Sequence, residues 1–136
     1  MAKKFTLGKN ERLKSRKQID QLFGEGKNFS LSPFRIYYRL MPLKADSSIL
    51  QFGAGVSAKN FKRAVDRNRI KRLTREAYRL QKIPLQEIAR QKKFQLNVFF
   101  IYTSKDLPEF SMVKEKVNVI LTRLINIVNE INSPAP

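Results

Sequence analysis

Residues 57–82 decide the fold, and they read Ser57-Ala-Lys-Asn-Phe-Lys-Arg-Ala-Val-Asp-Arg-Asn-Arg-Ile-Lys-Arg-Leu-Thr-Arg-Glu-Ala-Tyr-Arg-Leu-Gln-Lys82. The stretch contains ten Lys or Arg side chains and only two acidic ones, Asp66 and Glu76. More than a third of the basic residues of the chain therefore lie in less than a fifth of its length. The positive charge is concentrated in one segment.

Apolar residues recur at helical spacing from Asp66 onward. A helix over residues 66–82 would turn one apolar stripe to the core and gather cationic side chains on the opposite side. The stripe consists of Ile70, Leu73, Ala77 and Leu80, and the opposite side of Asn68, Lys71, Arg72, Arg75, Arg79 and Lys82. Asp66 is the predicted N-cap and Pro84 marks the predicted stop. Such a helix is about 25 Å long, enough to follow several phosphates of a nucleic acid.

The cationic side has two interpretations. A Lys- and Arg-rich helix face is often simply solvated, and it then usually carries Glu partners four residues away. Those partners are missing here, which favours phosphate binding. Arginine suits that role because its planar guanidinium fork matches the oxygens of a phosphate.

The composition of the whole chain points the same way. The 136 residues carry 28 Lys and Arg against 11 Asp and Glu, and this net charge of +17 indicates a polyanionic partner. Cys and His are absent, which removes disulfides, thiolate chemistry, the commonest general base and the commonest metal ligand. We find no apolar run long enough to span a membrane and no signal-peptide stretch, so we expect a cytoplasmic protein.

The length favours one domain with a core of moderate size. We expect a basic N-terminal arm over residues 1–14, a single RNA-binding domain over 15–132 and a frayed tail over 133–136. Ser15 and Gln18 fit a capping box for a short first helix. That helix carries Ile19, Leu22 and Phe23 on one side and ends near Gly24 or Gly26.

Two strands are predicted after the first helix. Residues 34–40 alternate, so that Arg35, Tyr37 and Arg39 face away from the core. An aromatic ring between two guanidinium groups has the composition of a platform for base stacking, although an ordinary solvent-facing strand surface explains it equally well. Residues 49–56 form the second strand, whose outer glycines permit another backbone to approach closely. The two strands most simply form an antiparallel hairpin.

The C-terminal part supplies a third strand and a last helix. A polar connector containing Arg90 leads to residues 94–102, which are apolar on both alternations and suit a central strand covered on both faces. Ser111 is the candidate N-cap of an amphipathic helix that extends to Ile131. The predicted order is α-β-β-α-β-α, with room for one further short strand, in an α+β sandwich. The first helix would cover part of the free sheet face beside Tyr37 and leave a cleft.

The segment Arg67-Asn68-Arg69-Ile70-Lys71-Arg72-Leu73 resembles a signature of the protein subunit of bacterial ribonuclease P. The likeness extends to Arg12-Leu13-Lys14, to residues 21–26 and to residues 55–59, so it spans about residues 10–130. Members of that family bind a large catalytic RNA and help it remove the 5′ leader of precursor tRNA. The resemblance implies an α/β sandwich like a ribosomal-protein domain, with an unusual left-handed βαβ crossover.

The resemblance assigns Arg67, Asn68, Arg69, Lys71 and Arg72 to the catalytic RNA, and Ile19, Phe23 and Tyr37 to the leader, and the charge pattern adds their basic neighbours to each set. The predicted contacts with the catalytic RNA are Lys59, Lys62, Arg63, Arg67, Asn68, Arg69, Lys71, Arg72 and Arg75. The predicted leader-binding cleft consists of Ile19, Phe23, Arg35, Tyr37 and Arg39. Ile19 departs from the family pattern, in which an aromatic residue is common at that place.

The acidic residues argue against an active site on this chain. A stand-alone metal nuclease needs clustered carboxylates, whereas these are scattered singly. We therefore expect no catalytic residue, metal site or cofactor here, and assign the chemistry and its Mg²⁺ to the RNA subunit of the holoenzyme. The expected partners are that RNA and precursor tRNA, with no membrane and no small-molecule substrate. The alternative is a structural ribosomal-type protein or RNA chaperone, which would not restore precursor tRNA cleavage to the RNA subunit at low Mg²⁺.

Overall fold

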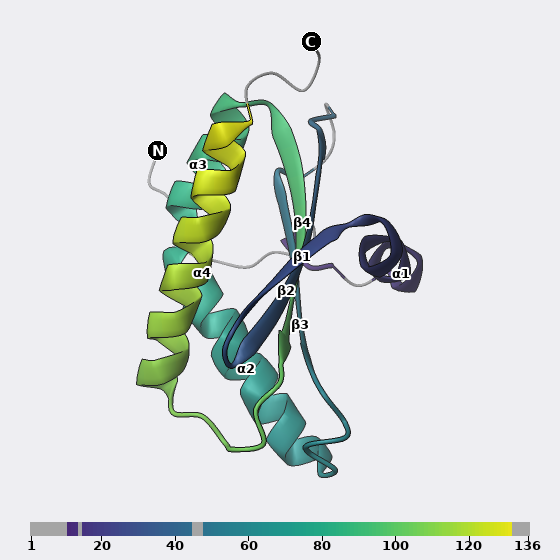
Figure 1. Ribbon diagram of the computed structural model, residues 1–136, viewed down its shortest axis with the longest axis vertical. Helices are drawn as coiled ribbons and strands as arrows, with labels where there is room; N and C mark the ends of the chain where they lie inside the picture. The colour runs from purple at the N-terminus through teal and green to yellow at the C-terminus, as the bar shows by residue number, and fades with distance from the viewer. Residues whose placement is uncertain (1–10, 14, 45–47, 132–136) are drawn as a thin grey trace.

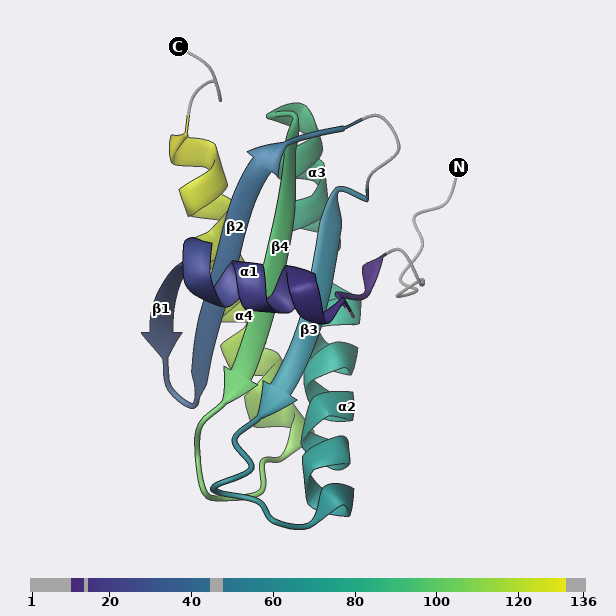
Figure 2. The ribbon, with the colours of Figure 1, turned by 90° about the vertical axis from the view of Figure 1, so that its right-hand side faces the viewer.

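The structure is a computed structural model that describes residues 11–13, 15–44 and 48–131. In this part of the chain four strands form one sheet, in the order β1-β2-β4-β3, and four helices cover it. The elements are α1 (Arg16–Glu25), β1 (Lys27–Leu31), β2 (Phe34–Pro42), β3 (Leu50–Val56), α2 (Ala64–Gln81), α3 (Ile83–Gln91), β4 (Phe94–Tyr102) and α4 (Phe110–Glu130). Helices α2, α3 and α4 lie on one face of the sheet and α1 crosses the other (Figures 1 and 2). The predicted α+β sandwich is confirmed.

The predicted hairpin of the second and third strands is wrong. β2 pairs antiparallel with β4, with Tyr37 opposite Phe99, and β3 pairs parallel with β4, with Gly53 opposite the same Phe99. The strand that is apolar on both alternations therefore lies between the two that we had paired. The hairpin partner of β2 is β1, the further short strand, in which Asn28 lies opposite Tyr37.

The connection from β3 to β4 has the unusual hand that the resemblance implied. In Figure 2 both strands point downward, β3 lies to the right of β4, and α2 and α3 return the chain behind the sheet. This path is a left-handed crossover, whereas parallel strands are joined by right-handed crossovers in almost all proteins.

Three helix boundaries differ from the sequence-based expectation. α2 begins at Ala64 with Arg63 as its N-cap, so Asp66 lies in the first turn, where its charge still complements the helix dipole. Pro84 does not end a helix but opens one, because a proline in the first turn of α3 removes no helical hydrogen bond. The predicted polar connector is thus the helix α3. The N-cap of α4 is Glu109 and not Ser111.

The first helix begins as predicted. The Ser15 side chain accepts a hydrogen bond from the backbone N–H of Gln18 at 3.4 Å. The helix ends at Glu25, and the N–H of the C-cap residue Gly26 donates to the carbonyl of Leu22 at 2.9 Å. Leu22 is buried under the helix, whereas Phe23 remains 41% exposed.

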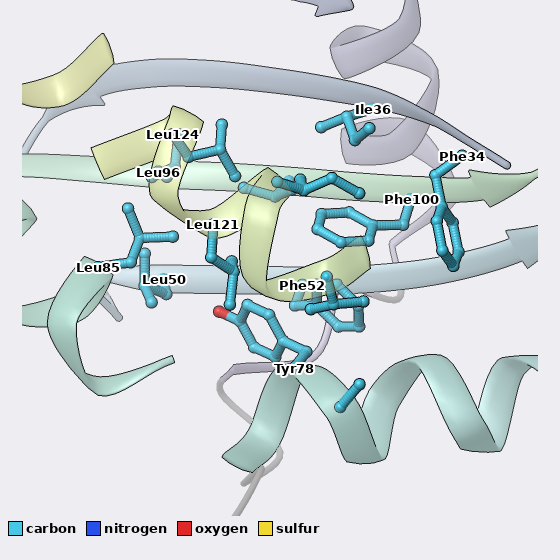
Figure 3. Packing of buried hydrophobic residues seen from close by; sticks show 14 of the residues in the cluster. Phe34, Ile36, Leu50, Phe52, Tyr78, Leu85, Leu96, Phe100, Leu121 and Leu124 are labelled. Carbon is cyan, nitrogen blue, oxygen red and sulfur yellow. The ribbon is translucent and has the colours of Figure 1, made fainter. Parts of the chain in front are cut away.

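The core lies between the sheet and the helices α2, α3 and α4 (Figure 3). Tyr78 of α2 makes one of its aromatic contacts, because its ring stacks on Phe52 of β3 at 3.9 Å and 8°. Three members of the predicted apolar stripe of α2 face the core, because Ile70 and Ala77 are buried and Leu73 packs against them partly buried. Leu80 is the exception, since it is 37% exposed, and Tyr78 is buried in addition.

The outer face of the sheet is shaped by the ring of Phe99. A Cβ atom built on Gly53 would lie 2.5 Å from this ring, and one on Gly55 would lie 2.8 Å from it. The two glycines thus make room for an aromatic side chain of the neighbouring strand, whereas we expected them to admit another backbone. None of the helices in the described ranges is long and apolar enough to cross a membrane.

We predict that Gly53→Ala lowers the free energy of unfolding by about 1–3 kcal/mol, because the added methyl group overpacks against the Phe99 ring. Gly24→Ala is the matched control. It lies in α1 with nothing within 4 Å of the added Cβ, so it should raise stability by about 0.5–1 kcal/mol. Urea unfolding of both variants tests this, and equal stability of Gly53→Ala and the parent protein would contradict it.

Candidate nucleic-acid interface

Three aromatic rings from three elements meet on the outer face of the sheet. The ring of Phe23, from α1, lies 4.7 Å from that of Tyr37 and 5.4 Å from that of Phe99, the second contact being edge-to-face. Phe23 is exposed and the other two rings are half-buried. We call these three residues the aromatic cluster. Their partly open ring surfaces have the chemistry on which nucleic-acid bases stack.

The two arginines that flank Tyr37 have different surroundings. The guanidinium carbon of Arg35 lies 5.7 Å from the centre of the Tyr37 ring, and its Nη2 donates to the Asn28 Oδ1 at 3.4 Å. Arg35 is therefore an exposed cation beside the aromatic cluster. Arg39 instead forms an ion pair of 3.2 Å with Glu25 at the end of α1, so it ties the helix to the sheet.

A cavity of about 340 Å³ opens where α1 approaches β3 and α2. Ile19 and Phe99 line it on the side of the aromatic cluster, and Arg12 and Arg75 line it on the side of the basic helix. Among the described residues, none that lines it is acidic. Of the predicted cleft residues, the structure thus brings Phe23, Tyr37 and Arg35 together, and it places Ile19 in this adjoining cavity.

Two residues of this region were not among the predicted cleft positions. Phe99 alternates with the core positions of β4, so its ring lies on the outer face and joins the aromatic cluster. The glycines at the paired positions of β3 were the sequence signal that could have indicated a bulky side chain on the neighbouring strand. Arg12 was expected in an N-terminal arm, but it forms an isolated parallel bridge with Phe52 at the free edge of β3. No pattern within the basic N-terminal segment indicated that contact.

The basic helix α2 and the loop before it present most of the predicted phosphate-binding side chains to solvent. Lys71 is half-buried, and the exposed members of the predicted set are Lys59, Lys62, Arg63, Asn68, Arg69, Arg72 and Arg75. The loop is held in place by Asn60, whose Nδ2 donates to the carbonyl of Thr103 at 2.9 Å. The predicted set therefore forms a surface along the helix and the loop, which we call the α2 surface.

Arg67 differs from the rest of the predicted set. Its Nη1 donates to the carbonyl of Phe61 at 2.9 Å and to that of Lys62 at 2.7 Å. These bonds fix the loop that carries the exposed Lys62. Arg63 lies 3.9 Å from the Asp66 carboxylate, but its side chain is 77% exposed. Arg67 thus supports the α2 surface by holding its loop in place, whereas the exposed Arg63 is part of that surface.

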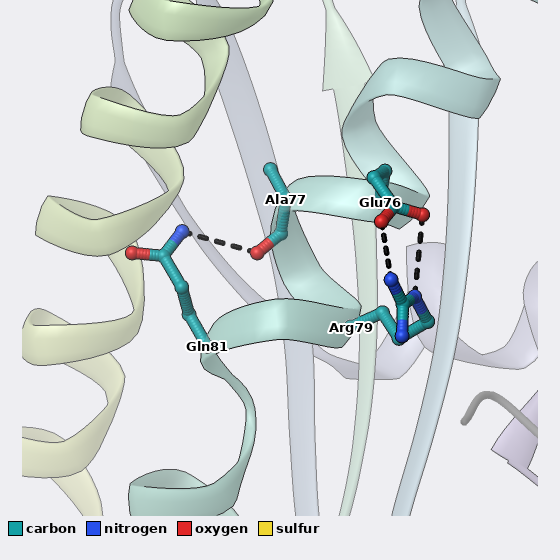
Figure 4. A network of polar contacts seen from close by, with 4 residues as sticks. All are labelled: Glu76, Ala77, Arg79 and Gln81. Atoms are coloured by element: carbon teal, nitrogen blue, oxygen red, sulfur yellow. Dashed lines mark hydrogen bonds and ion pairs between the residues drawn. The ribbon is translucent and has the colours of Figure 1, made fainter. Parts of the chain in front are cut away.

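The acidic residue in the middle of α2 is neutralised within the helix. The Glu76 carboxylate accepts two hydrogen bonds from the Arg79 guanidinium, one of them from Nε at 3.2 Å (Figure 4). The hydrogen bonds hold the pKa of Glu76 below its usual value. Because Arg79 neutralises Glu76, the electrostatic field along the helix stays positive.

The C-terminal end of α2 is joined to α4. Gln81 Nε2 donates to the carbonyl of Lys114 at 3.1 Å, and Gln81 Oε1 accepts from Asn118.

Acidic side chains elsewhere in the described residues are also dispersed. Across residues 11–13, 15–44 and 48–131 there is no group of three Asp or Glu side chains placed to hold a metal ion together. The chemistry that these residues offer is charge neutralisation and aromatic stacking.

Comparison with known proteins identifies relatives along most of the chain. A family model described as Ribonuclease P matches residues 7–125. The ribonuclease P protein component of Porphyromonas gingivalis is 42% identical over 122 residues, which cover 88% of this chain and 87% of the relative. That of Chlorobium phaeobacteroides is 30% identical over 125 residues, covering 85% and 86%.

Solved structures share the same fold. The ribonuclease P protein of Thermotoga maritima matches with a TM-score of 0.62 at 26% identity and covers 83% of this chain and 96% of that chain. The Staphylococcus aureus protein gives a TM-score of 0.62 at 18% identity. The chain therefore belongs to the ribonuclease P protein family, whose role is RNA binding and tRNA 5′ processing within the holoenzyme that cleaves precursor tRNA.

Proposed function

We propose that this protein uses two separate surfaces, the α2 surface for the catalytic RNA and the cleft around the aromatic cluster for the 5′ leader of precursor tRNA. The observation that carries the proposal is the aromatic cluster itself. The Phe23 ring lies 4.7 Å from that of Tyr37 and 5.4 Å from that of Phe99, and the exposed Arg35 lies next to Tyr37. Rings beside a cation suit unpaired bases, and the leader supplies single-stranded bases.

The α2 surface supports the other half of the proposal by its charge and its length. Seven of the predicted RNA contacts are exposed along the helix and its preceding loop, and α2 has 18 residues. This arrangement suits a structured RNA, whose phosphates lie close together and attract guanidinium groups. Arg75 lies at the border of the two surfaces because it also lines the cavity beside Ile19.

In this proposal the RNA subunit and its Mg²⁺ carry out the hydrolysis. The protein supplies no catalytic residue, metal site or cofactor, and its partners are the catalytic RNA and precursor tRNA. It uses no membrane or small-molecule substrate, and both partner RNAs place its action in the cytoplasm. The scattered carboxylates and the dense positive charge support this division of labour.

We predict that protein freed of RNA does not cleave precursor tRNA at any Mg²⁺ concentration. The reason is that its sequence lacks His and Cys, and that the part of the chain described by the structure has no grouped carboxylates for such chemistry. The measurement is cleavage of labelled precursor after nuclease treatment and repurification. Adding the matching RNA subunit should restore cleavage at low Mg²⁺, and activity that persists without RNA would contradict the proposal.

We predict that Arg72→Ala weakens assembly with the catalytic RNA without changing stability. If the α2 surface neutralises about six phosphates, log K should fall with log salt with a slope of about −4 to −5, and this variant should flatten the slope by about one charge. Arg67→Ala is the contrasting variant. It should also lower the free energy of unfolding by about 1–3 kcal/mol, because two loop carbonyls lose their donor. An unchanged slope and affinity for Arg72→Ala would remove it from the interface.

We predict that Tyr37→Ala weakens holoenzyme binding of leader-bearing precursor tRNA about tenfold, since stacking on a ring is worth about 1–3 kcal/mol per base. Mature tRNA should bind as before. Tyr37→Phe is the matched control, because it keeps the ring and should retain precursor affinity. Binding is measured at saturating protein, so that assembly does not limit it. Equal losses for precursor and mature tRNA would show that the leader does not occupy this cleft.

A further inference from the structure

The segment before α1 is docked on the free edge of β3. We call Glu11, Arg12 and Leu13 the strap. The backbone N–H of Leu13 donates to the carbonyl of Phe52 at 2.9 Å, and Arg12 bridges to the same residue in parallel. The Leu13 side chain is 4% exposed. The strap therefore extends the sheet beyond its edge strand by one short contact.

A buried ion pair fastens the strap to the junction of α2 and α3. Lys82 lies at the junction of α2 and α3 with a side chain that is only 2% exposed, and its Nζ lies 2.6 Å from the Glu11 Oε1. The Glu11 carboxylate also lies close to Tyr78. Burial and this nearby negative charge together raise the pKa of Tyr78. An ammonium group at this depth needs a partner of opposite charge, since removing it from water is costly.

The strap is also part of the wall of the cavity. Arg12 and Leu13 line it together with Ile19, and Arg75 lies at the same cavity. The strap leads directly toward Ser15, the N-cap of α1. Its position therefore determines both where Arg12 lies and where the helix that carries Phe23 begins.

We propose that Lys82 is a positioning residue for leader binding, which rests on the function proposed above. Through Glu11 it holds the strap on β3. The strap in turn holds Arg12 beside Arg75 at the cavity and anchors the start of α1 across the sheet. Lys82 itself touches no RNA in this arrangement, because its side chain is enclosed in the protein.

The two partners of the ion pair respond differently to the loss of the other. The Glu11 side chain is 22% exposed and belongs to a short segment, so without the Lys82 ammonium its carboxylate can turn toward water and loosen the strap. Lys82 cannot reach water in the same way. Lys82→Met is therefore the informative variant, since methionine fills the space of the lysine stem with an apolar group and leaves the core folded.

The first test measures hydrogen exchange at the backbone N–H of Leu13 in the protein alone. We expect Lys82→Met to accelerate this exchange at least tenfold while amides in the centre of β4 exchange as before. Glu87→Gln is the matched control, because it removes a carboxylate from an exposed ion pair of 4.0 Å with Arg90 on α3. It should leave Leu13 exchange unchanged. Wild-type exchange at Leu13 in Lys82→Met would overturn the proposal.

The second test measures binding of precursor and mature tRNA by holoenzyme reconstituted with each variant. We expect Lys82→Met to weaken precursor binding about fivefold and to leave mature tRNA binding and RNA-subunit assembly unchanged. A purely structural lysine would change all three together or none of them, and either result would overturn the proposal. If Lys82→Met does not fold, Arg12→Ala replaces it, because this exposed residue of the strap can be changed without disturbing the core. Precursor binding that is undiminished in Arg12→Ala would overturn the proposal.

The two tests also separate this inference from the proposed function. If the leader does not bind in the cleft, Tyr37→Ala will leave the preference for precursor unchanged. Leu13 exchange in Lys82→Met will then still report whether the ion pair holds the strap. If the cleft does bind the leader and Leu13 exchange is unaffected, only the role of Lys82 is wrong.

Discussion

The rest of the structure depends on the need to cover β4 on both faces. Its side chains are apolar throughout on one side, where Phe100 and Val98 are fully buried, and the other side carries the half-buried Phe99 and Ile101. A strand of this kind is stable only in the centre of a sheet with packing above and below. Three helices complete one side, but only the ten-residue α1 is available for the other. The incomplete cover leaves part of the aromatic cluster accessible, and the cleft is the result.

The same packing that completes the core directs the positive charge outward. Tyr78 stacks on Phe52 and turns one side of α2 toward the sheet, so Asn68, Arg72 and Arg75 lie on the side that faces solvent. Glu76 is held by Arg79 and does not oppose the arginines around it. A single amphipathic helix thus both closes the core and forms the RNA-binding surface proposed here.

The sequence predicted features that depend on local periodicity and failed where distant partners decide. The existence of α2, the cap at Ser15 and the outward face of β2 follow from spacing along one segment, and all are present in the structure. The pairing of β2 and β3 was wrong because register between strands depends on β4, which comes later in the chain. Arg67 belonged to the signature by its spacing, but its role in holding the Phe61 and Lys62 carbonyls depends on loop geometry that periodicity does not contain.

The two proposed surfaces rely on forces that respond differently to solution conditions. Phosphate neutralisation by the exposed arginines of α2 releases counterions and weakens steeply with salt. Stacking on Phe23 and Tyr37 depends on ring contact and is far less sensitive to screening. The cavity lined by Arg12, Arg75 and Phe99 combines both forces at the border between the surfaces. A strap that places Arg12 there would therefore add charge at the edge of the proposed leader site, away from the stacking surface.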